Sequence, residues 1–161
     1  MISDVDLKYL ERSVELAREA LETGNSPFGS MLVDGDGKVR FEDHNRIAGG
    51  DDTQHPEIAI ARWAAENMSP EERAKAIVYT SGEHCAMCAA AHGWVGLGRI
   101  VYASSTEQLI GWLDELGAAR PPITPLPINE VVPGLKVDGP APSLAETVKN
   151  LHTRYLRKEN G

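Results

Sequence analysis

The chain has 161 residues, 42% of them hydrophobic and 25% charged, and a formal net charge of −8 at pH 7. This length suffices for one ordinary hydrophobic core, so residues 1–161 are expected to form a single domain. The acidic balance argues against an extended phosphate-binding surface, and hence against nucleic acid as a partner. Residues 1–22 mix charged with apolar residues, which predicts neither a signal peptide nor a membrane-spanning segment.

The chain contains two cysteines, Cys85 and Cys88, which are too few for a disulfide framework. Their C-x-x-C spacing favours metal binding or redox chemistry in a reducing compartment. A cytoplasmic location is therefore expected.

The first part of the chain predicts a helix followed by a β-hairpin. Ser3 and Asp6 form a capping pair for an amphipathic helix, and Gly24 is suited to end it. The Asp-Gly-Asp-Gly sequence at 34–37 favours a turn between two strands. The helix and the two strands are expected at residues 7–21, 29–33 and 39–41.

The middle of the chain predicts alternating helices and strands. Pro56 suits a first helical position, so His55 should lie at a helix N-terminus. Helices are expected at residues 55–65, 85–95 and 106–116, with a short helical turn from residue 69. Strands are expected at residues 77–80 and 100–103. The proline-rich stretch 121–140 should be mostly extended, and a terminal helix should cover 143–157.

Two short motifs carry the chemistry. His55-Pro56-Glu57 precedes Cys85-Ala86-Met87-Cys88, with 30 positions between His55 and Cys85. Structural zinc usually has four protein ligands, whereas catalytic zinc has three and leaves its fourth position to water. One histidine and two cysteines therefore predict a catalytic zinc site, with Glu57 as a nearby carboxylate that is not a ligand.

The expected positions at helix N-termini suggest a role for the two cysteines, the zinc-bound water and Glu57. Cys85 and Cys88 are three residues apart in the first turn of a helix, whose positive end favours thiolates. Zn²⁺ would lower the pKa of a bound water towards about 7 and make hydroxide available for attack on a carbon. Glu57 would take a proton from this water, protonate a ring nitrogen of the substrate, and later deliver a proton to the departing amine.

The two motifs, H-x-E with a later C-x-x-C, are the signature of zinc nucleobase deaminases. The sequence resembles the cytidine deaminase superfamily, and within it the branch of cytosine, guanine and tRNA-adenosine deaminases. Three further segments carry this resemblance. Pro27-Phe28-Gly29 is similar to the family's P-F-G motif, and Asn45 together with residues 52–57 is similar to its N…D-x-T-x-H-A-E motif. Residues 83–88 are similar to its E-P-C-P-M-C motif. Pro56, His84 and Ala86 depart from the usual residues, and none of these changes removes a ligand or the carboxylate.

The resemblance implies an α/β protein with a three-layer α/β/α fold, in which a mixed five-stranded sheet is flanked by helices. It implies that Asn45 hydrogen-bonds the base and that Phe28 forms part of the wall around it. It also implies a homodimer, and residues 121–161 as a C-terminal extension that caps the site of its own chain or of a partner.

Three further substrate contacts are expected. His84 adjoins the first cysteine ligand and would bear on substrate choice. Trp112 follows the fourth strand, where this branch often carries specificity elements, and is a candidate for the pocket rim. Tyr155 in the terminal helix is a candidate to cap the pocket. Because the chain is acidic, a free base such as guanine, cytosine or an amino-triazine is favoured over tRNA, with nucleosides as a further alternative.

Other interpretations remain open from the residues alone. His84 or His92 could complete a four-ligand structural zinc site, and C-A-M-C could be a thioredoxin-like redox pair. Glu57 could simply favour a helix dipole. Asn45 could hold its loop through local hydrogen bonds, and Phe28 could pack in the core.

Overall fold

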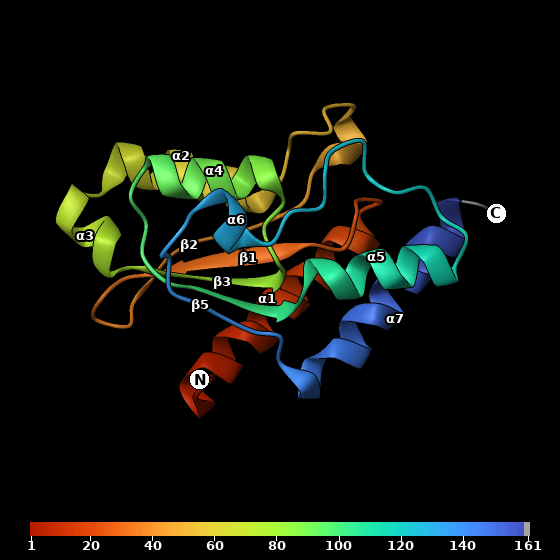
Figure 1. The fold of residues 1–161 in the computed structure, drawn as a ribbon, viewed down its shortest axis with the longest axis horizontal. Helices are drawn as coiled ribbons and strands as arrows, with labels where there is room; N and C mark the ends of the chain where they lie inside the picture. Colours follow the sequence, from red (N-terminus) through yellow and green to blue (C-terminus); the bar gives the residue numbers. More distant parts are fainter. Residues whose placement is uncertain (160–161) are drawn as a thin grey trace.

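The computed structural model describes residues 1–159, which form helices and strands in alternation (Figure 1). The strands are β1 (Gly29–Val33), β2 (Val39–His44), β3 (Ile77–Gly82), β4 (Ile100–Ser104) and β5 (Val137–Asp138). The helices are α1 (Asp4–Glu22), α2 (Pro56–Asn67), α3 (Pro70–Lys75), α4 (Ala86–Trp94), α5 (Thr106–Glu115), α6 (Ile128–Val131) and α7 (Pro142–Glu159), with a 3₁₀ turn at Ile47–Gly49.

The strands form one sheet in the order β2-β1-β3-β4-β5. β1 is antiparallel to both β2 and β3, whereas β3, β4 and β5 run parallel. The connection from β3 to β4 passes through α4, as parallel neighbours require a crossover. The expected mixed five-stranded sheet is confirmed.

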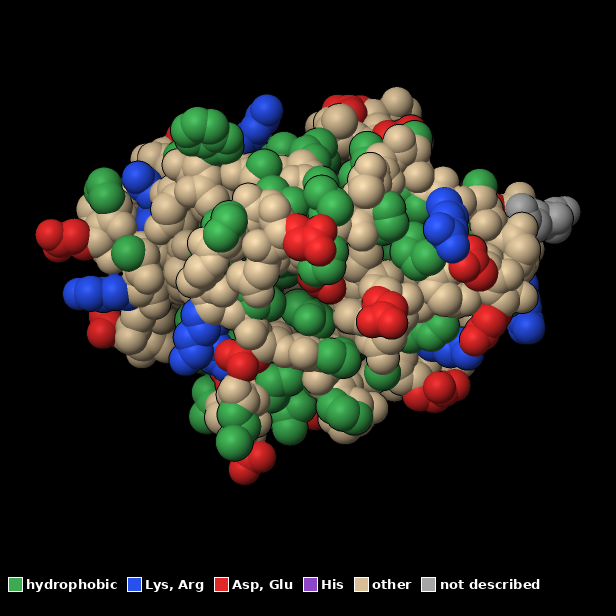
Figure 2. Space-filling view, in the orientation of Figure 1, with side chains coloured by type: hydrophobic (Ala, Val, Ile, Leu, Met, Phe, Trp, Pro, Cys, Tyr) green, Lys and Arg blue, Asp and Glu red, His purple; other side chains and the backbone are tan. Residues whose placement is uncertain are grey.

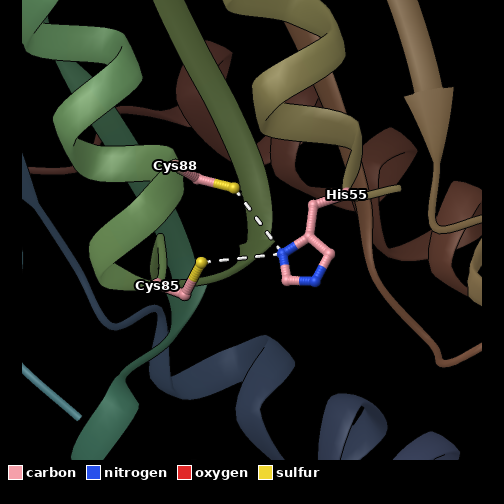
Figure 3. Close-up of side chains that lie close together, drawn as sticks. All are labelled: His55, Cys85 and Cys88. Atoms are coloured by element: carbon pink, nitrogen blue, oxygen red, sulfur yellow. Dashed lines mark hydrogen bonds between the residues drawn. The ribbon is translucent and has the colours of Figure 1, made fainter. Parts of the chain in front are cut away.

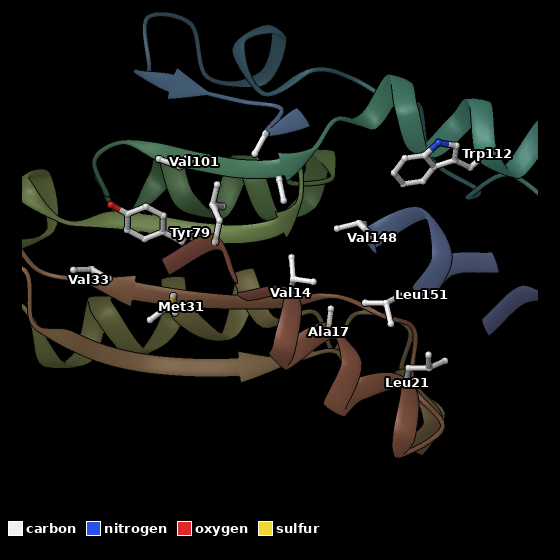
Figure 4. Close-up of a cluster of buried hydrophobic side chains, with 13 residues drawn as sticks. Val14, Ala17, Leu21, Met31, Val33, Tyr79, Val101, Trp112, Val148 and Leu151 are labelled. Atoms are coloured by element: carbon white, nitrogen blue, oxygen red, sulfur yellow. The ribbon is translucent and has the colours of Figure 1, made fainter. Parts of the chain in front are cut away.

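Helices cover both faces of the sheet and give three layers (Figure 1). α1 and α7 pack on one face, and α2 with α4 on the other. A buried cluster on the first face joins α1 and α7 to the sheet through residues such as Leu10, Val14, Tyr79 and Leu151 (Figure 4). A second cluster on the opposite face contains Ile60 and Ile100. The α/β/α fold expected from the sequence is confirmed.

Local signals start the helices where the sequence predicts. Ser3 and Asp6 form a complete capping box at the start of α1. His55 and Cys85 are the N-cap residues of α2 and α4, and Pro56 is the first residue of α2. Residues of the two zinc motifs therefore lie at helix N-termini, as expected.

The stretch 121–140 contains more structure than its composition predicts. α6 interrupts it, and β5 extends the sheet by pairing Val137 with Ile100 of β4. Both elements are short and depend on contacts distant in sequence, which local patterns cannot reveal. β2 also continues beyond the expected residue 41 to His44.

None of the helices within residues 1–159 is both long enough and apolar enough to span a membrane.

Candidate zinc centre and its cavity

Three side chains converge where α2 and α4 begin (Figure 3). Nδ1 of His55 lies 3.6 Å from Sγ of Cys85 and 3.6 Å from Sγ of Cys88. All three donor atoms lie within 4.8 Å of one another. The two thiols belong to one helical turn, and the imidazole faces them from the neighbouring helix.

These distances suit a tetrahedral zinc ion. Zn–S bonds of about 2.3 Å and Zn–N bonds of about 2.0 Å at tetrahedral angles separate S from N by about 3.6 Å. Among the described residues, no further His, Cys, Asp or Glu joins the three donors in such a group. Three protein ligands with a free fourth position characterise a catalytic zinc site rather than a structural one.

The protonation of the two thiols is coupled. A hydrogen bond from Cys88 lowers the pKa of Cys85 to about 4, and His55 adds to the effect. The same bond, together with burial, raises the pKa of Cys88. A divalent cation would displace the remaining proton, because zinc binds thiolates.

Glu57 lies beside this centre and is the second residue of α2. Its side chain is buried, and burial is the main cause that raises its pKa. Oε1 lies 2.9 Å from Oγ of Ser30 and 3.1 Å from Oγ1 of Thr80. Neither hydroxyl contacts Oε2, and Glu57 is one of the residues that line the cavity described below.

A cavity of about 430 Å³ opens onto the three donors and Glu57. This volume lies within the range of small-molecule sites. Among the described residues that line it, three are acidic and none is lysine or arginine. The proline-rich segment 121–126 forms one wall of the cavity, and Leu109 and Ile110 of α5 add to its apolar lining.

Asn45 and Phe28 both line the cavity. Oδ1 of Asn45 accepts a hydrogen bond from the backbone N–H of Ile47, which leaves Nδ2 as a donor. Phe28 is held from two sides: Gly82 is so close that an added Cβ would lie 3.1 Å from the ring, and His152 packs edge-on at 4.9 Å between ring centroids.

The other three expected substrate contacts are not among the residues that line the cavity. His84 is 1% exposed and packs against His92 at 5.5 Å between ring centroids, on the side of the loop away from the cavity lining. Trp112 is buried in the core cluster between α5 and α7. Tyr155 is half-buried and packs against the same cluster. Trp112 and Tyr155 lie on the sides of α5 and α7 that face the core, whereas His84 is buried in the loop between β3 and α4.

Sequence reasoning missed other groups at the site. Ser30 and Thr80 are polar residues within buried strands, which is a signal that could have drawn attention to them. Glu83 also lines the cavity, next to segment 121–126, which belongs to the stretch expected to cap the site. Their position depends on contacts between distant parts of the chain.

Comparison with known proteins agrees with this site. The family model of the cytidine and deoxycytidylate deaminase zinc-binding region matches residues 3–104. A probable cytosine deaminase of Schizosaccharomyces pombe is 34% identical over 120 residues, covering 74% of this chain and 73% of the relative. A tRNA-specific adenosine deaminase of Agrobacterium fabrum is 36% identical over 101 residues, covering 62% of this chain and 66% of the relative.

Solved structures share the fold. A guanine deaminase from Nitrosomonas europaea superposes with a TM-score of 0.70 at 18% identity, covering 98% of this chain and 86% of that chain. A structure from a study of tRNA:A34 deaminases has a TM-score of 0.54 at 35% identity, and the match covers 62% of this chain and 76% of that chain. The zinc donor set, the sheet and these matches lead to one conclusion: the chain belongs to the cytidine and deoxycytidylate deaminase family of zinc-dependent hydrolytic deaminases.

Proposed function

We propose that this deaminase acts on a free amino-nucleobase: guanine, cytosine or a related amino-purine, amino-pyrimidine or amino-triazine. The observation that carries the proposal is the cavity of about 430 Å³ that opens onto the zinc donors and Glu57. None of the described residues that line this cavity is lysine or arginine. A phosphorylated or polynucleotide substrate would be expected to meet cations at such a site. A neutral base needs none.

The chain's own residues support hydrolysis. Zinc at His55, Cys85 and Cys88 would supply a water whose pKa is lowered towards about 7. Oε2 of Glu57 takes one proton from the attacking water and delivers it to a ring nitrogen of the base. It then takes the second proton, from the hydroxyl added to the carbon, and delivers it to the amine, which leaves as ammonia as the C–N bond breaks. Ser30 and Thr80 hold Oε1 and so fix the direction of Oε2.

Two residues are proposed to position the base. Nδ2 of Asn45 donates a hydrogen bond to a ring or carbonyl acceptor. The ring of Phe28, fixed between Gly82 and His152, provides an aromatic wall. Segment 121–126 lines the cavity of its own chain, which supports the proposal that this part of the C-terminal extension caps its own site.

The main alternative within the family is editing of tRNA. A relative named as a tRNA-specific adenosine deaminase matches this chain at 36% identity, similar to the 34% of the cytosine and guanine deaminases, although the match to the cytosine deaminase covers more of the chain. The net charge of −8 opposes binding of an anticodon stem. On the face in Figure 2, Lys and Arg side chains are scattered among Asp and Glu, and no continuous basic stripe forms.

A screen for ammonia release tests the proposal. The purified zinc protein is incubated with cytosine, guanine, isoguanine, adenine, their nucleosides, amino-triazines and a tRNA anticodon stem, with the Glu57→Gln protein as the inactive control. We expect ammonia from at least one free base, at a kcat/KM well above that for its nucleoside. Turnover of the tRNA stem alone would contradict the proposal and establish the alternative.

We further propose that the enzyme is a homodimer in the cytoplasm. The indole of Trp94 at the end of α4 is 90% exposed, an unusual position for so large an apolar group and one that a second copy would cover. The two thiols at the zinc site require reducing conditions. Sedimentation equilibrium of the zinc protein tests the dimer, and a monomer at all concentrations would contradict it.

A further inference from the structure

Glu83 connects three parts of the chain near the zinc centre. It follows β3 and precedes the ligand Cys85 by two residues. Oε1 accepts a hydrogen bond of 2.9 Å from the backbone N–H of Thr106, and Oε2 accepts one of 2.9 Å from the backbone N–H of Ile128. One carboxylate thus holds the first residue of α5 and the first residue of α6.

The segment between these two anchors includes residues 121–126, which cover the cavity. In the described structure, no hydrogen bond joins residues 121–126 to another part of the chain. Three of the six residues are prolines and have no N–H to donate. The position of this segment therefore depends on apolar contacts and on the anchors at its two ends.

Glu83 has no ion-pair partner among the described residues. The two backbone amides are the partners of its carboxylate, and the N-terminus of α5 favours its negative charge. Glu83, Thr106, Ile110 and Pro125 also line a second cavity of about 590 Å³. These four residues therefore form the partition between that cavity and the zinc site.

We propose that Glu83 is a positioning residue that holds segment 121–126 over the zinc site and thereby sets the affinity for substrate. The effect on binding rests on the proposed function, whereas the effect on the segment does not. Glu83 acts on the covering wall and touches neither the reacting groups nor the zinc donors. Its loss should therefore change substrate affinity much more than the chemical step.

The test uses two variants of the full-length zinc protein. Glu83→Ala removes both hydrogen bonds. Glu83→Gln keeps the shape of the side chain, but its NH₂ group must face one of the two N–H donors, so one bond is lost. Glu130→Gln is the matched control, because Glu130 is an exposed acidic residue in the first turn of α6 whose side chain makes no hydrogen bond or ion pair in the described structure.

We expect KM for the preferred base to rise about tenfold in Glu83→Gln and further in Glu83→Ala, since about one charge-assisted hydrogen bond is lost in the first variant. The value of kcat and the zinc content should remain near those of the parent. Hydrogen exchange should become faster at the amides of Thr106 and Ile128, which lose their acceptor, and at Leu126, whose N–H is bonded within the segment. Glu130→Gln should match the parent in all of these measurements.

Unchanged exchange at Thr106 and Ile128 would overturn the proposal, and Glu83→Gln keeps this test open if Glu83→Ala does not fold. Faster exchange with unchanged KM would overturn the link to substrate affinity. A loss of zinc and kcat without a rise in KM would assign Glu83 to the metal site instead. If no base is deaminated, the proposed function fails, yet the exchange experiment still decides whether Glu83 holds the segment.

Discussion

The hydroxyl oxygen of Ser30 lies 2.9 Å from Oε1 of Glu57 and joins a buried strand to the carboxylate proposed as the acid/base, in the first zinc-site helix. Thr80, the residue paired with Ser30 across β1 and β3, lies 3.1 Å from the same oxygen. Ser30 and Thr80 are also 2.8 Å apart, so the two hydroxyls form one network. The network leaves Oε2 free and directs it to the cavity.

Replacement of Ser30 by alanine should lower kcat without loss of zinc. The variant removes one hydrogen bond to a carboxylate, which contributes about 1.5–3 kcal/mol, so kcat should fall by roughly tenfold or more if the bond orients Glu57. Steady-state kinetics and metal analysis measure both effects. Ser13→Ala is the matched control: Ser13 is equally buried, but its hydroxyl bonds to the backbone carbonyls of Tyr9 and Tyr79, away from the site. Equal losses in both variants would show that only stability is affected.

Glu57→Gln should retain zinc and the fold but lose turnover. General acid–base catalysis by one side chain typically contributes about 10² to 10⁴ in rate, and an amide cannot carry the proton. The Ser30 and Thr80 hydroxyls can still bond to the amide oxygen, so the side chain should keep its place. Ammonia release and zinc content are measured together. Near-parental turnover would remove Glu57 from the catalytic cycle.

Cys85→Ser should lose zinc and stability together. Sγ of Cys85 is one of three donors, and metal binding to a folded site adds its free energy to folding. We expect substoichiometric zinc and a lower thermal midpoint, and a strong chelator should lower the midpoint of the parent in the same direction. Full zinc occupancy with a parental midpoint would contradict the assignment of this ligand.

Local signals explain how much of the zinc centre could be predicted. His55 and Cys85 are N-cap residues, and Pro56 marks a helix start, so the motifs fix their own geometry within a few residues. The remaining contacts are not local. Ser30 reaches Glu57 only through the register that pairs Ser30 with Thr80, and a shift of one residue would point it to the other face.

His84 shows why adjacency in sequence misleads. It precedes the ligand Cys85, yet its side chain is buried against His92. Successive residues in an extended segment point to opposite sides, so a neighbour of a ligand is a poor candidate for the same cavity. Glu83, one position earlier, does line the cavity, and its partners are 23 and 45 residues away.

Asp6 should govern stability in acid. Burial tends to raise the pKa of its carboxyl, but hydrogen bonds from Arg99, Ser3 and Tyr79 outweigh burial and hold the pKa well below its usual range. A carboxyl with a lowered folded pKa stabilises the fold above the unfolded pKa of about 3.9, and this contribution is lost as pH falls below that value. Asp6→Asn should cost about 3 kcal/mol at pH 7, as expected when one partner of a buried pair is removed.

The difference between the parent and Asp6→Asn should narrow as pH falls from about 5 to below 3, because the unfolded parent chain takes up a proton at Asp6 there while the folded carboxyl stays charged. Urea unfolding at a series of pH values measures it. A difference that stays constant over this range would show that packing of Asp6, rather than its charge, stabilises the fold.

His152 should affect the stability of the fold in a higher pH range than Asp6 does. It packs against Phe28 and Trp112, and burial lowers its pKa to about 4 from an unfolded value of 6.5. The folded protein therefore binds fewer protons than the unfolded chain between these values, so the free energy of unfolding falls as pH drops from 6.5 to about 4 and is unaffected above 6.5. Over this pH range the loss in the free energy of unfolding is about 3 kcal/mol.

The variant His152→Phe keeps an aromatic ring but cannot titrate. It should therefore lose less stability than the parent between pH 7 and pH 4.5 in urea unfolding. Parallel losses in the two proteins would show that His152 does not remain neutral in the fold.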